Sequence, residues 1–185
     1  GLKASAHSNG PMCGITGSLG GGDADLVHRM VASLEHRGPD GIRTWADDDC
    51  ALGHSRLSIV DLASSDQPIG SEHGCWLVQN GEIYNHQQLR KALEQHDYRF
   101  RGHSDTEVAA AAFEQWGFEA SLSRFTGMFA FAVWDRREQA LFLARDRLGE
   151  KPLYYGFTNE LFIFSSELAA ARSQPDGEWQ VNRNA

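Results

Sequence analysis

Apolar residues recur at helical spacing in three segments of the chain, and each segment follows a residue type that starts helices. Asp23 is the N-cap candidate for the first helix, which Gly38 would end. Asn85 is the N-cap candidate for the second helix, and Ser104 with Glu107 has the spacing of a capping box for the third. The apolar faces predicted for these helices are Leu26, Met30, Val31 and Leu34; Leu89, Ala92 and Leu93; and Val108, Ala111 and Phe113.

Hydrophobic runs of strand length lie between and after these helices. A run that begins at or just after Cys13 and the segments 42–45, 51–54 and 76–78 predict short strands. In the last third of the chain, the runs MFAFAVWD, ALFLARD, PLYYGF and LFIFSS are separated by charged or Asn-Glu turns, which favours antiparallel hairpins. An α+β layered domain is therefore the expected fold class. The aromatic residues expected to pack in its core are Phe129, Phe131, Trp134, Tyr154 and Tyr155.

Composition narrows the function classes. The 185 residues suffice for one domain, and 41% hydrophobic and 23% charged residues are ordinary for a globular protein. The formal net charge of −8 argues against a nucleic-acid partner, because such binding needs clustered Lys and Arg. No apolar run approaches the roughly 20 residues that span a bilayer, and the N-terminus lacks the apolar core of a signal peptide. We therefore expect no membrane partner and a cytoplasmic location.

Three cysteines at wide spacing match neither a disulfide framework nor a zinc site. Cys50 and Cys75 are expected to be small buried residues. The histidines have no metal-ligand spacing, so no metal site is expected. Cys13 differs because it follows Met12: if the methionine is removed, the thiol and a free α-amine belong to one residue, and the amine can accept the thiol proton near neutral pH. Residues 1–11 are interpreted as a cloning leader and residues 12–185 as the domain.

Several motifs together resemble the glutaminase domain of asparagine synthetases, in the class II glutamine amidotransferase family. Besides the Met-Cys-Gly start, they are HRGPDG at 36–41, HSRLSIVD at 54–61, VQNGEIYNH at 78–86 and GHSDTE at 102–107. The later segments GMFAFAVWD and ARDRLGEKPLYYG extend the match over most of the chain. The resemblance implies a four-layer αββα sandwich of the N-terminal nucleophile (Ntn) hydrolase type, in which two antiparallel sheets are flanked by helices.

The resemblance also implies site residues. Cys13 would attack the side-chain amide of L-glutamine, while the Asn80 side chain and the Gly81 N–H would stabilise the oxyanion. Arg56 would bind the substrate α-carboxylate through its guanidinium fork. Asp105, with Glu82, would bind the α-ammonium. Leu57 and Val60 complete the substrate-binding set that the resemblance implies.

Each of these residues has an ordinary structural alternative. Arg56 could be a simple ion-pair partner, and Asn80-Gly81 between apolar flanks is a standard hairpin turn. Ser104 with Asp105 could be only a helix cap. For the segment 145–151, with Arg145, Asp146 and Lys151, we expect a structural or domain-contact role rather than a catalytic one.

The implied partners are L-glutamine and a synthetase domain that the chain lacks. The glutaminase half-reaction is expected to need no cofactor, whereas ATP and magnesium belong to the missing synthetase domain. A homodimer is a further partner considered. Alternatives are a glutaminase domain that serves another ammonia acceptor, a non-catalytic glutamine-binding or interaction domain, and an amidohydrolase that cuts its own leader. With residues 1–12 attached, Cys13 has an amide instead of an α-amine, so the chain as written is expected to be a poor glutaminase.

Overall fold

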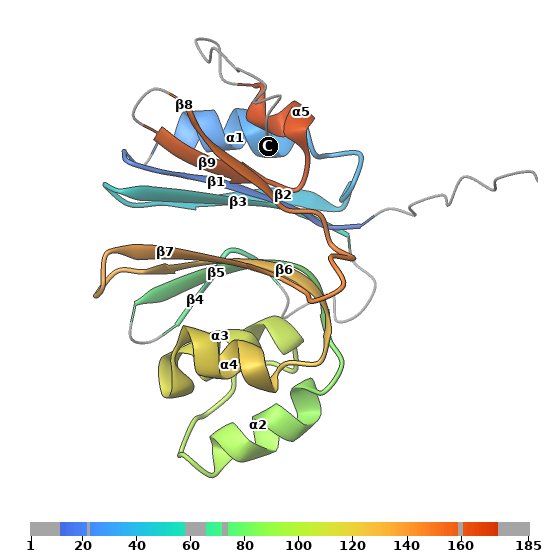
Figure 1. Cartoon of the computed structure of the whole chain (residues 1–185), viewed down its shortest axis with the longest axis vertical. Coiled ribbons are helices and arrows are strands. Elements are labelled where there is room, and N and C mark those ends of the chain that lie inside the picture. The colour runs from blue at the N-terminus through green and yellow to red at the C-terminus, as the bar shows by residue number, and fades with distance from the viewer. Residues whose placement is uncertain (1–11, 22, 58–65, 72–73, 159–160, 174–185) are drawn as a thin grey trace, which may run out of the picture.

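The computed structural model describes residues 12–21, 23–57, 66–71, 74–158 and 161–173. Two antiparallel sheets lie face to face, and helices cover the outer face of each (Figure 1). The first sheet has the strand order β2-β3-β1-β9-β8, with β1 Gly14–Leu19, β2 Gly41–Ala46, β3 Cys50–Arg56, β8 Tyr154–Thr158 and β9 Leu161–Ser165. The second has the order β4-β5-β6-β7, with β4 Ile69–Gly70, β5 Cys75–Ile83, β6 Gly127–Asp135 and β7 Ala140–Arg145.

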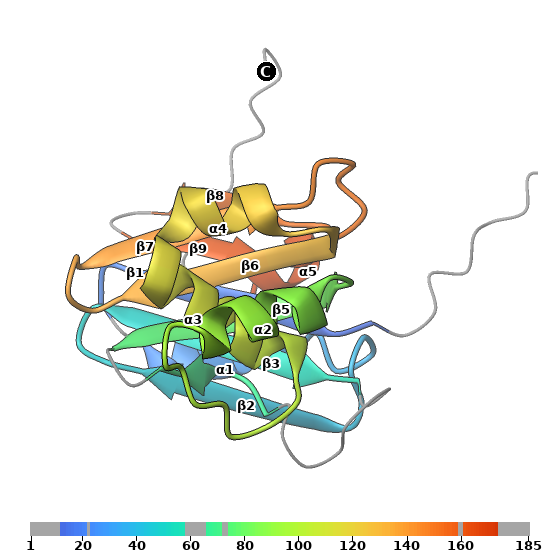
Figure 2. The same cartoon turned by 90° about the horizontal axis from the view of Figure 1, so that it is seen from below.

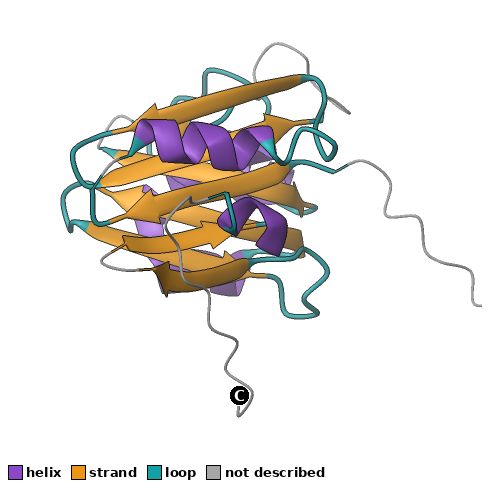
Figure 3. Cartoon of the chain, turned by 90° about the horizontal axis from the view of Figure 1, so that it is seen from above, coloured by secondary structure: helices purple, strands orange, loops and turns teal. Residues whose placement is uncertain are grey.

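The helices complete a four-layer αββα sandwich. α1 Ala24–Ala32 and α5 Leu168–Ala171 lie on the first sheet, and Figure 3 shows them above its strands. α2 His86–Glu94, α3 Asp105–Trp116 and α4 Phe118–Arg124 lie on the side of the second sheet, as Figure 2 shows from below. The expected α+β fold class is thus confirmed. None of the helices in the described segments has the length and apolar content that a membrane-spanning helix needs.

Side-chain alternation along the strands separates two cores. On β6, Ala130, Ala132 and Trp134 face the first sheet, whereas Phe129, Phe131 and Val133 face the helices. Large aromatic side chains therefore fill the layer under α3 and α4, while alanines on the opposite face let the two sheets approach. Cys50 and Cys75 are buried free thiols, as expected.

The C-terminal hairpins form as predicted: β6 pairs with β7, and β8 pairs with β9. One expectation for this region is wrong. Tyr154 and Tyr155 are 44% and 72% exposed, not core residues. They lie on β8, an edge strand of the first sheet, which among the described strands has a neighbour on one side only, β9. An apolar run by itself does not reveal which strand ends up at an edge.

The predicted helix starts have different outcomes. Asp23 caps α1, since its carboxylate accepts a hydrogen bond from Leu26 N at 2.8 Å. Asn85 precedes α2, but its side chain makes no cap hydrogen bond. Its amide instead accepts from Thr126 N at 3.0 Å and donates to Arg124 O at 2.9 Å. These partners lie about forty residues along the chain, beyond the reach of a local pattern.

Only half of the predicted capping box forms at α3. The Ser104 hydroxyl accepts from Glu107 N at 3.2 Å, as expected. The Glu107 carboxylate, however, accepts from Arg101 N at 2.7 Å and Gly102 N at 2.9 Å. It therefore orders the loop before the helix, and this loop presents Asp105, the first residue of α3, to the space beside β5.

Candidate active site

A cavity of about 310 Å³ lies beside the point where β1 begins. Residues of both sheets, of α3 and of the connecting loops contribute to its wall. Of the residues that the resemblance implied, Cys13, Arg56, Leu57, Asn80, Gly81, Glu82 and Asp105 line it together. Val60 falls outside the described residues. Segments that are far apart in the sequence thus line the same cavity.

Cys13 stands directly before β1 and places its sulfur on the cavity wall. Leu57 N donates to Cys13 Sγ at 3.4 Å, and Sγ lies 3.8 Å from Leu57 O. Burial raises the pKa of the thiol, and this outweighs the lowering by backbone N–H groups and by the charges of Arg56 and Arg37. The thiol is therefore protonated at neutral pH, so a base is needed to form the reactive thiolate.

The Asn80 side chain presents a buried N–H donor to the cavity. The residue is 1% exposed and lines the cavity. Among the residues that the structure describes, none accepts a hydrogen bond from its Nδ2. Leaving a buried amide unsatisfied costs about 1–3 kcal/mol, so such a group suggests a ligand or transition state as its acceptor.

Gly81 follows Asn80 on β5, and its N–H faces the open edge of that strand. β4 pairs with Trp76 and Leu77, and none of the described strands lies beside the later part of β5 on that side. Gln79 N donates to the Gln67 side chain at 2.5 Å, and Ile83 N donates to the Asp105 carboxylate at 2.9 Å. Because backbone groups alternate in direction along a strand, Gly81 N, midway between them, points to the same edge.

The hairpin alternative for Asn80-Gly81 is wrong, because the strand continues through both residues opposite Ala130 and Phe129 of β6. Gly81 has a φ of 120°, which L side chains rarely adopt. A Cβ at this position would also collide with the Met128 carbonyl. Glycine is therefore required here by conformation and by space.

Gly81→Ala is expected to lower the free energy of unfolding by about 3 kcal/mol or more, because it adds a backbone collision to the cost of positive φ. Gly117→Ala is the matched control, since Gly117 also has a positive φ of 78° but open space around it. It is expected to cost only about 1 kcal/mol. Urea unfolding of both variants measures the difference, and equal losses would contradict the predicted collision.

Charged groups mark two sides of the cavity. Arg56 donates to Asp66 at 2.8 Å, and Asp66 also binds Arg43 at 2.7 Å. Arg56 is thus an ion-pair partner, which was its structural alternative, and its side chain also lines the cavity. Asp105 accepts from Gln79 Nε2 at 2.7 Å and from Ile83 N at 2.9 Å, both through Oδ2. A cation and an anion are therefore fixed in the same cavity wall.

The sequence motifs did not single out several wall residues as site residues. Gln67 and Gln79 hold the β5 edge in place, and Thr106 adds a hydroxyl that accepts from Gln67 Nε2 at 3.3 Å. Gln79 was detectable, because it directly precedes Asn80-Gly81, whereas nothing in the pattern marks Gln67. Met128 also lines the cavity, opposite the Gly81 backbone.

Hydrogen bonds shape a turn in the segment 145–151, and one of its side chains reaches the cavity. The Asp146 carboxylate accepts from the backbone N–H groups of Leu148, Glu150 and Lys151 and so shapes the turn. The Lys151 side chain nevertheless reaches the cavity, where its Nζ lies 3.0 Å from Met12 Sδ. Met12 therefore takes up part of the wall next to Cys13.

His54 is a neutral member of the wall. Burial, assisted by the charge of Arg56, lowers its pKa to about 3. Within the described segments its Nε2 has no hydrogen-bond partner. The described residues also contain no group of three or more His, Cys, Asp or Glu that could hold a metal ion.

Two antiparallel sheets that lie face to face, each covered by helices on its outer side, form the fold of the Ntn hydrolase class, and Cys13 directly precedes strand β1 of this fold. Residues 12–185 match the glutamine amidotransferase domain family, and the chain belongs to that family.

The similar proteins agree with this assignment. Asparagine synthetase (glutamine-hydrolyzing) 3 of Bacillus subtilis is 37% identical over 180 residues, which are 93% of this chain and 29% of that protein. Asparagine synthetase (glutamine-hydrolyzing) 2 of Oryza sativa is 42% identical over 166 residues, 86% of this chain and 28% of that protein. The chain thus spans less than a third of the length of these relatives.

Solved structures share the fold. The glutamine phosphoribosylpyrophosphate amidotransferase of B. subtilis, in complex with ADP and GMP, superposes with a TM-score of 0.73 at 25% identity, over 87% of this chain and 43% of that one. A second structure, an allosteric regulatory enzyme of purine biosynthesis, has a TM-score of 0.75 at 22% identity, over 91% of this chain and 44% of that one.

Proposed function

We propose that this domain hydrolyses the side-chain amide of L-glutamine to glutamate and ammonia through a thioester on Cys13. The observation that carries the proposal is that the Cys13 thiol and the Asn80 amide, whose Nδ2 has no acceptor among the described residues, line one cavity, whose wall also contains Arg56 and Asp105. The similarity to glutamine-hydrolysing asparagine synthetases supports glutamine as the substrate.

Glutamine recognition follows from the charges in the wall. Arg56 binds the α-carboxylate, for which its planar guanidinium offers two parallel N–H donors. Asp105 uses Oδ2 for two protein donors, and its Oδ1 is directed to the α-ammonium, with Glu82 adding negative charge at the rim. Leu57 forms the wall between them. The amide end of the substrate then lies between the Cys13 sulfur and Asn80.

The reaction begins when the α-amine of a terminal Cys13 takes the thiol proton and the thiolate attacks the amide carbon. The Asn80 side chain and Gly81 N–H stabilise the resulting oxyanion. The C–N bond breaks while the α-ammonium protonates the leaving nitrogen, which departs as ammonia. Water, deprotonated by the same amine, then attacks the γ-glutamyl thioester through a second oxyanion, and glutamate and the free thiol are released.

The side chains and the terminal amine carry out the attack, the oxyanion stabilisation and every proton transfer in this cycle. We therefore propose that hydrolysis uses no metal or organic cofactor. By analogy with the relatives, the ammonia serves asparagine synthesis in a synthetase domain that uses ATP and magnesium. Because Cys13 must remain a reduced thiol, we place the reaction in the cytoplasm. A homodimer stays a prediction.

Arg56→Lys is expected to raise the KM for glutamine by about 10- to 100-fold while kcat changes by less than about threefold. The reason is that lysine loses the bidentate contact with the carboxylate, which binds substrate and transition state alike. Arg43→Lys is the control, because Arg43 binds the same Asp66 but does not line the cavity. A fall in kcat with unchanged KM would contradict the assigned role of Arg56.

The proposed function is tested by measuring glutamate and ammonia from the form of the protein that begins at Cys13. Equal amounts of both products from L-glutamine, with much slower hydrolysis of L-asparagine and D-glutamine, are expected. Glutamine binding, measured by calorimetry, without product release would instead support the non-catalytic alternative.

A further inference from the structure

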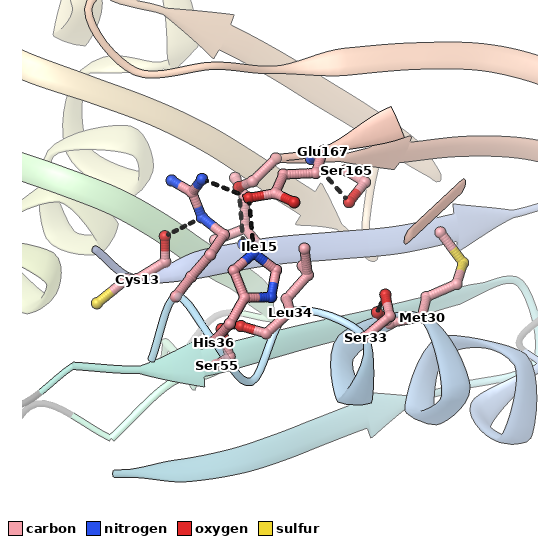
Figure 4. A network of polar contacts seen from close by, with 11 residues as sticks. Cys13, Ile15, Met30, Ser33, Leu34, His36, Ser55, Ser165 and Glu167 are labelled. Atoms are coloured by element: carbon pink, nitrogen blue, oxygen red, sulfur yellow. Dashed lines mark hydrogen bonds and ion pairs between the residues drawn. The ribbon is translucent and has the colours of Figure 1, made fainter. Parts of the chain in front are cut away.

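Glu167 lies outside the cavity wall yet is connected to Cys13 through one intervening side chain. Arg37 Nε donates to the Cys13 carbonyl oxygen at 3.2 Å, and Arg37 Nη1 donates to Glu167 Oε1 at 2.8 Å. Figure 4 shows Cys13 and Glu167 in this network of polar contacts, with the Cys13 sulfur pointing away from Glu167. The contacts join the start of β1, the turn after α1 and the end of β9.

Ser166, which directly precedes Glu167, binds Ile15 near the start of β1. Ser166 N donates to Ile15 O at 2.8 Å, and Ile15 N donates to Ser166 Oγ at 3.0 Å. The β1–β9 ladder itself ends at the pair Thr16 and Ser165. Ser166 therefore adds hydrogen bonds to β1 one residue beyond the ladder, at Ile15. The Glu167–Arg37 pair adds a further contact, at Cys13.

A nucleophile at the end of a chain needs such an anchor. Chain termini fray unless they are tied down, and a Cys13 that is the first residue has no preceding segment to restrain it. Among the described residues, the hydrogen-bond contacts of its sulfur are long ones with the Leu57 backbone, at 3.4 Å to N and 3.8 Å to O. The carbonyl group is thus the part of the residue through which a buried side chain restrains its position.

We propose that Glu167 is a positioning residue for the glutaminase reaction, which it supports by holding the Arg37 guanidinium against the Cys13 carbonyl. This inference rests on the proposed function, and it adds a residue that touches neither glutamine nor the reacting atoms. Glu167 is not among the described residues that line the cavity. It therefore affects the placement of the nucleophile and leaves the substrate contacts intact.

The electrostatics of the pair fit this role. Burial opposes ionisation of Glu167, but hydrogen bonds from Arg37 and His36 outweigh it and lower the pKa of the carboxyl. The carboxylate is therefore charged at neutral pH. Arg37 is only 9% exposed, and within the described residues its Nη2 has no hydrogen-bond partner. Glu167 is thus the anion that holds a mostly buried guanidinium, whereas the His36 side chain on its other side is 60% exposed.

Hydrogen–deuterium exchange tests the anchor without any assay of activity. In the full 185-residue chain, Glu167→Gln is expected to speed exchange of the backbone amides at 13–16 by about tenfold, relative to the parent. The control is Glu94→Gln, which removes the Arg90–Glu94 ion pair on α2. It is expected to leave this segment unchanged. Unchanged exchange in Glu167→Gln would overturn the anchor.

Kinetics of the form that begins at Cys13 test the consequence for catalysis. Glu167→Gln is expected to lower kcat about tenfold with KM within about twofold, since a small misplacement of a reacting group is costly. Glu167→Asp keeps the charge on a shorter side chain and is expected to recover part of the rate. If Glu167→Gln does not fold, Glu167→Asp is the variant in which kcat and KM are compared with those of the parent. An unchanged kcat, or a raised KM with normal kcat, would overturn the proposal. If the parent itself releases no glutamate, the proposed function fails, and exchange still decides whether the anchor exists.

Discussion

Cys13→Ala, in the form that begins at residue 13, is expected to release glutamate at less than about a thousandth of the parent rate, because it removes the atom that forms the thioester. The substitution deletes only a sulfur atom from the cavity wall. Glutamine should therefore still bind, since Arg56 and Asp105 remain. The measurements are glutamate release under saturating glutamine and glutamine binding by calorimetry.

Cys75→Ala is the matched control for the loss of a thiol. Cys75 is buried at the start of β5, and burial raises its pKa to about 12, so it is unreactive at neutral pH. The control is expected to keep full activity with a small loss of stability. Substantial glutamate release by Cys13→Ala would show that a different group attacks the amide.

Asn80→Ala is expected to lower kcat by about 10²- to 10³-fold, the usual cost of removing one oxyanion donor. It should not lower the free energy of unfolding by the amount typical of a lost hydrogen bond, because Nδ2 has no acceptor among the described residues. Loss of rate without a matching loss of stability is the result that separates a catalytic amide from a structural one. Steady-state kinetics and urea unfolding of the same preparation measure both.

Asn85→Ala is the matched control for this prediction. Its amide binds Thr126 N and Arg124 O, so its removal is expected to cost about 1–3 kcal/mol of stability and to leave kcat nearly unchanged. The two asparagines, five residues apart, should thus respond in opposite ways. A stability loss in Asn80→Ala equal to that in Asn85→Ala would contradict the oxyanion role.

Local sequence patterns predicted the parts of this fold that depend on neighbours along the chain. The Asp23 cap and the C-terminal hairpins are examples, because a cap or a tight turn is formed by residues a few positions apart. The exposure of Tyr154 and Tyr155 and the partners of Asn85 could not be predicted in this way. They depend on which strand lies at a sheet edge and on contacts between distant segments.

In the candidate site, too, local patterns mark some residues, whereas contacts between distant segments decide what the others do. Asn80-Gly81 has the residue types of an oxyanion site, but its local pattern, taken singly, favours a hairpin turn. Only the pairing of β5 with β6 excluded that turn and left the two donors beside Cys13. Gln67 and Glu167 carry no local signal, since their importance arises from the groups they reach, on β5 and at Arg37.

The proposed role of the Cys13 α-amine is to act as the base for the buried thiol of the same residue. It is tested most directly by comparing glutamate release from two forms of the protein, one beginning at Cys13 and one with residues 1–12 attached, each confirmed by intact mass. We expect release by the first form and a rate at least about 100-fold lower for the second, because an amide nitrogen cannot accept the thiol proton. Equal rates from both forms, with the mass of the longer form unchanged after the assay, would contradict it.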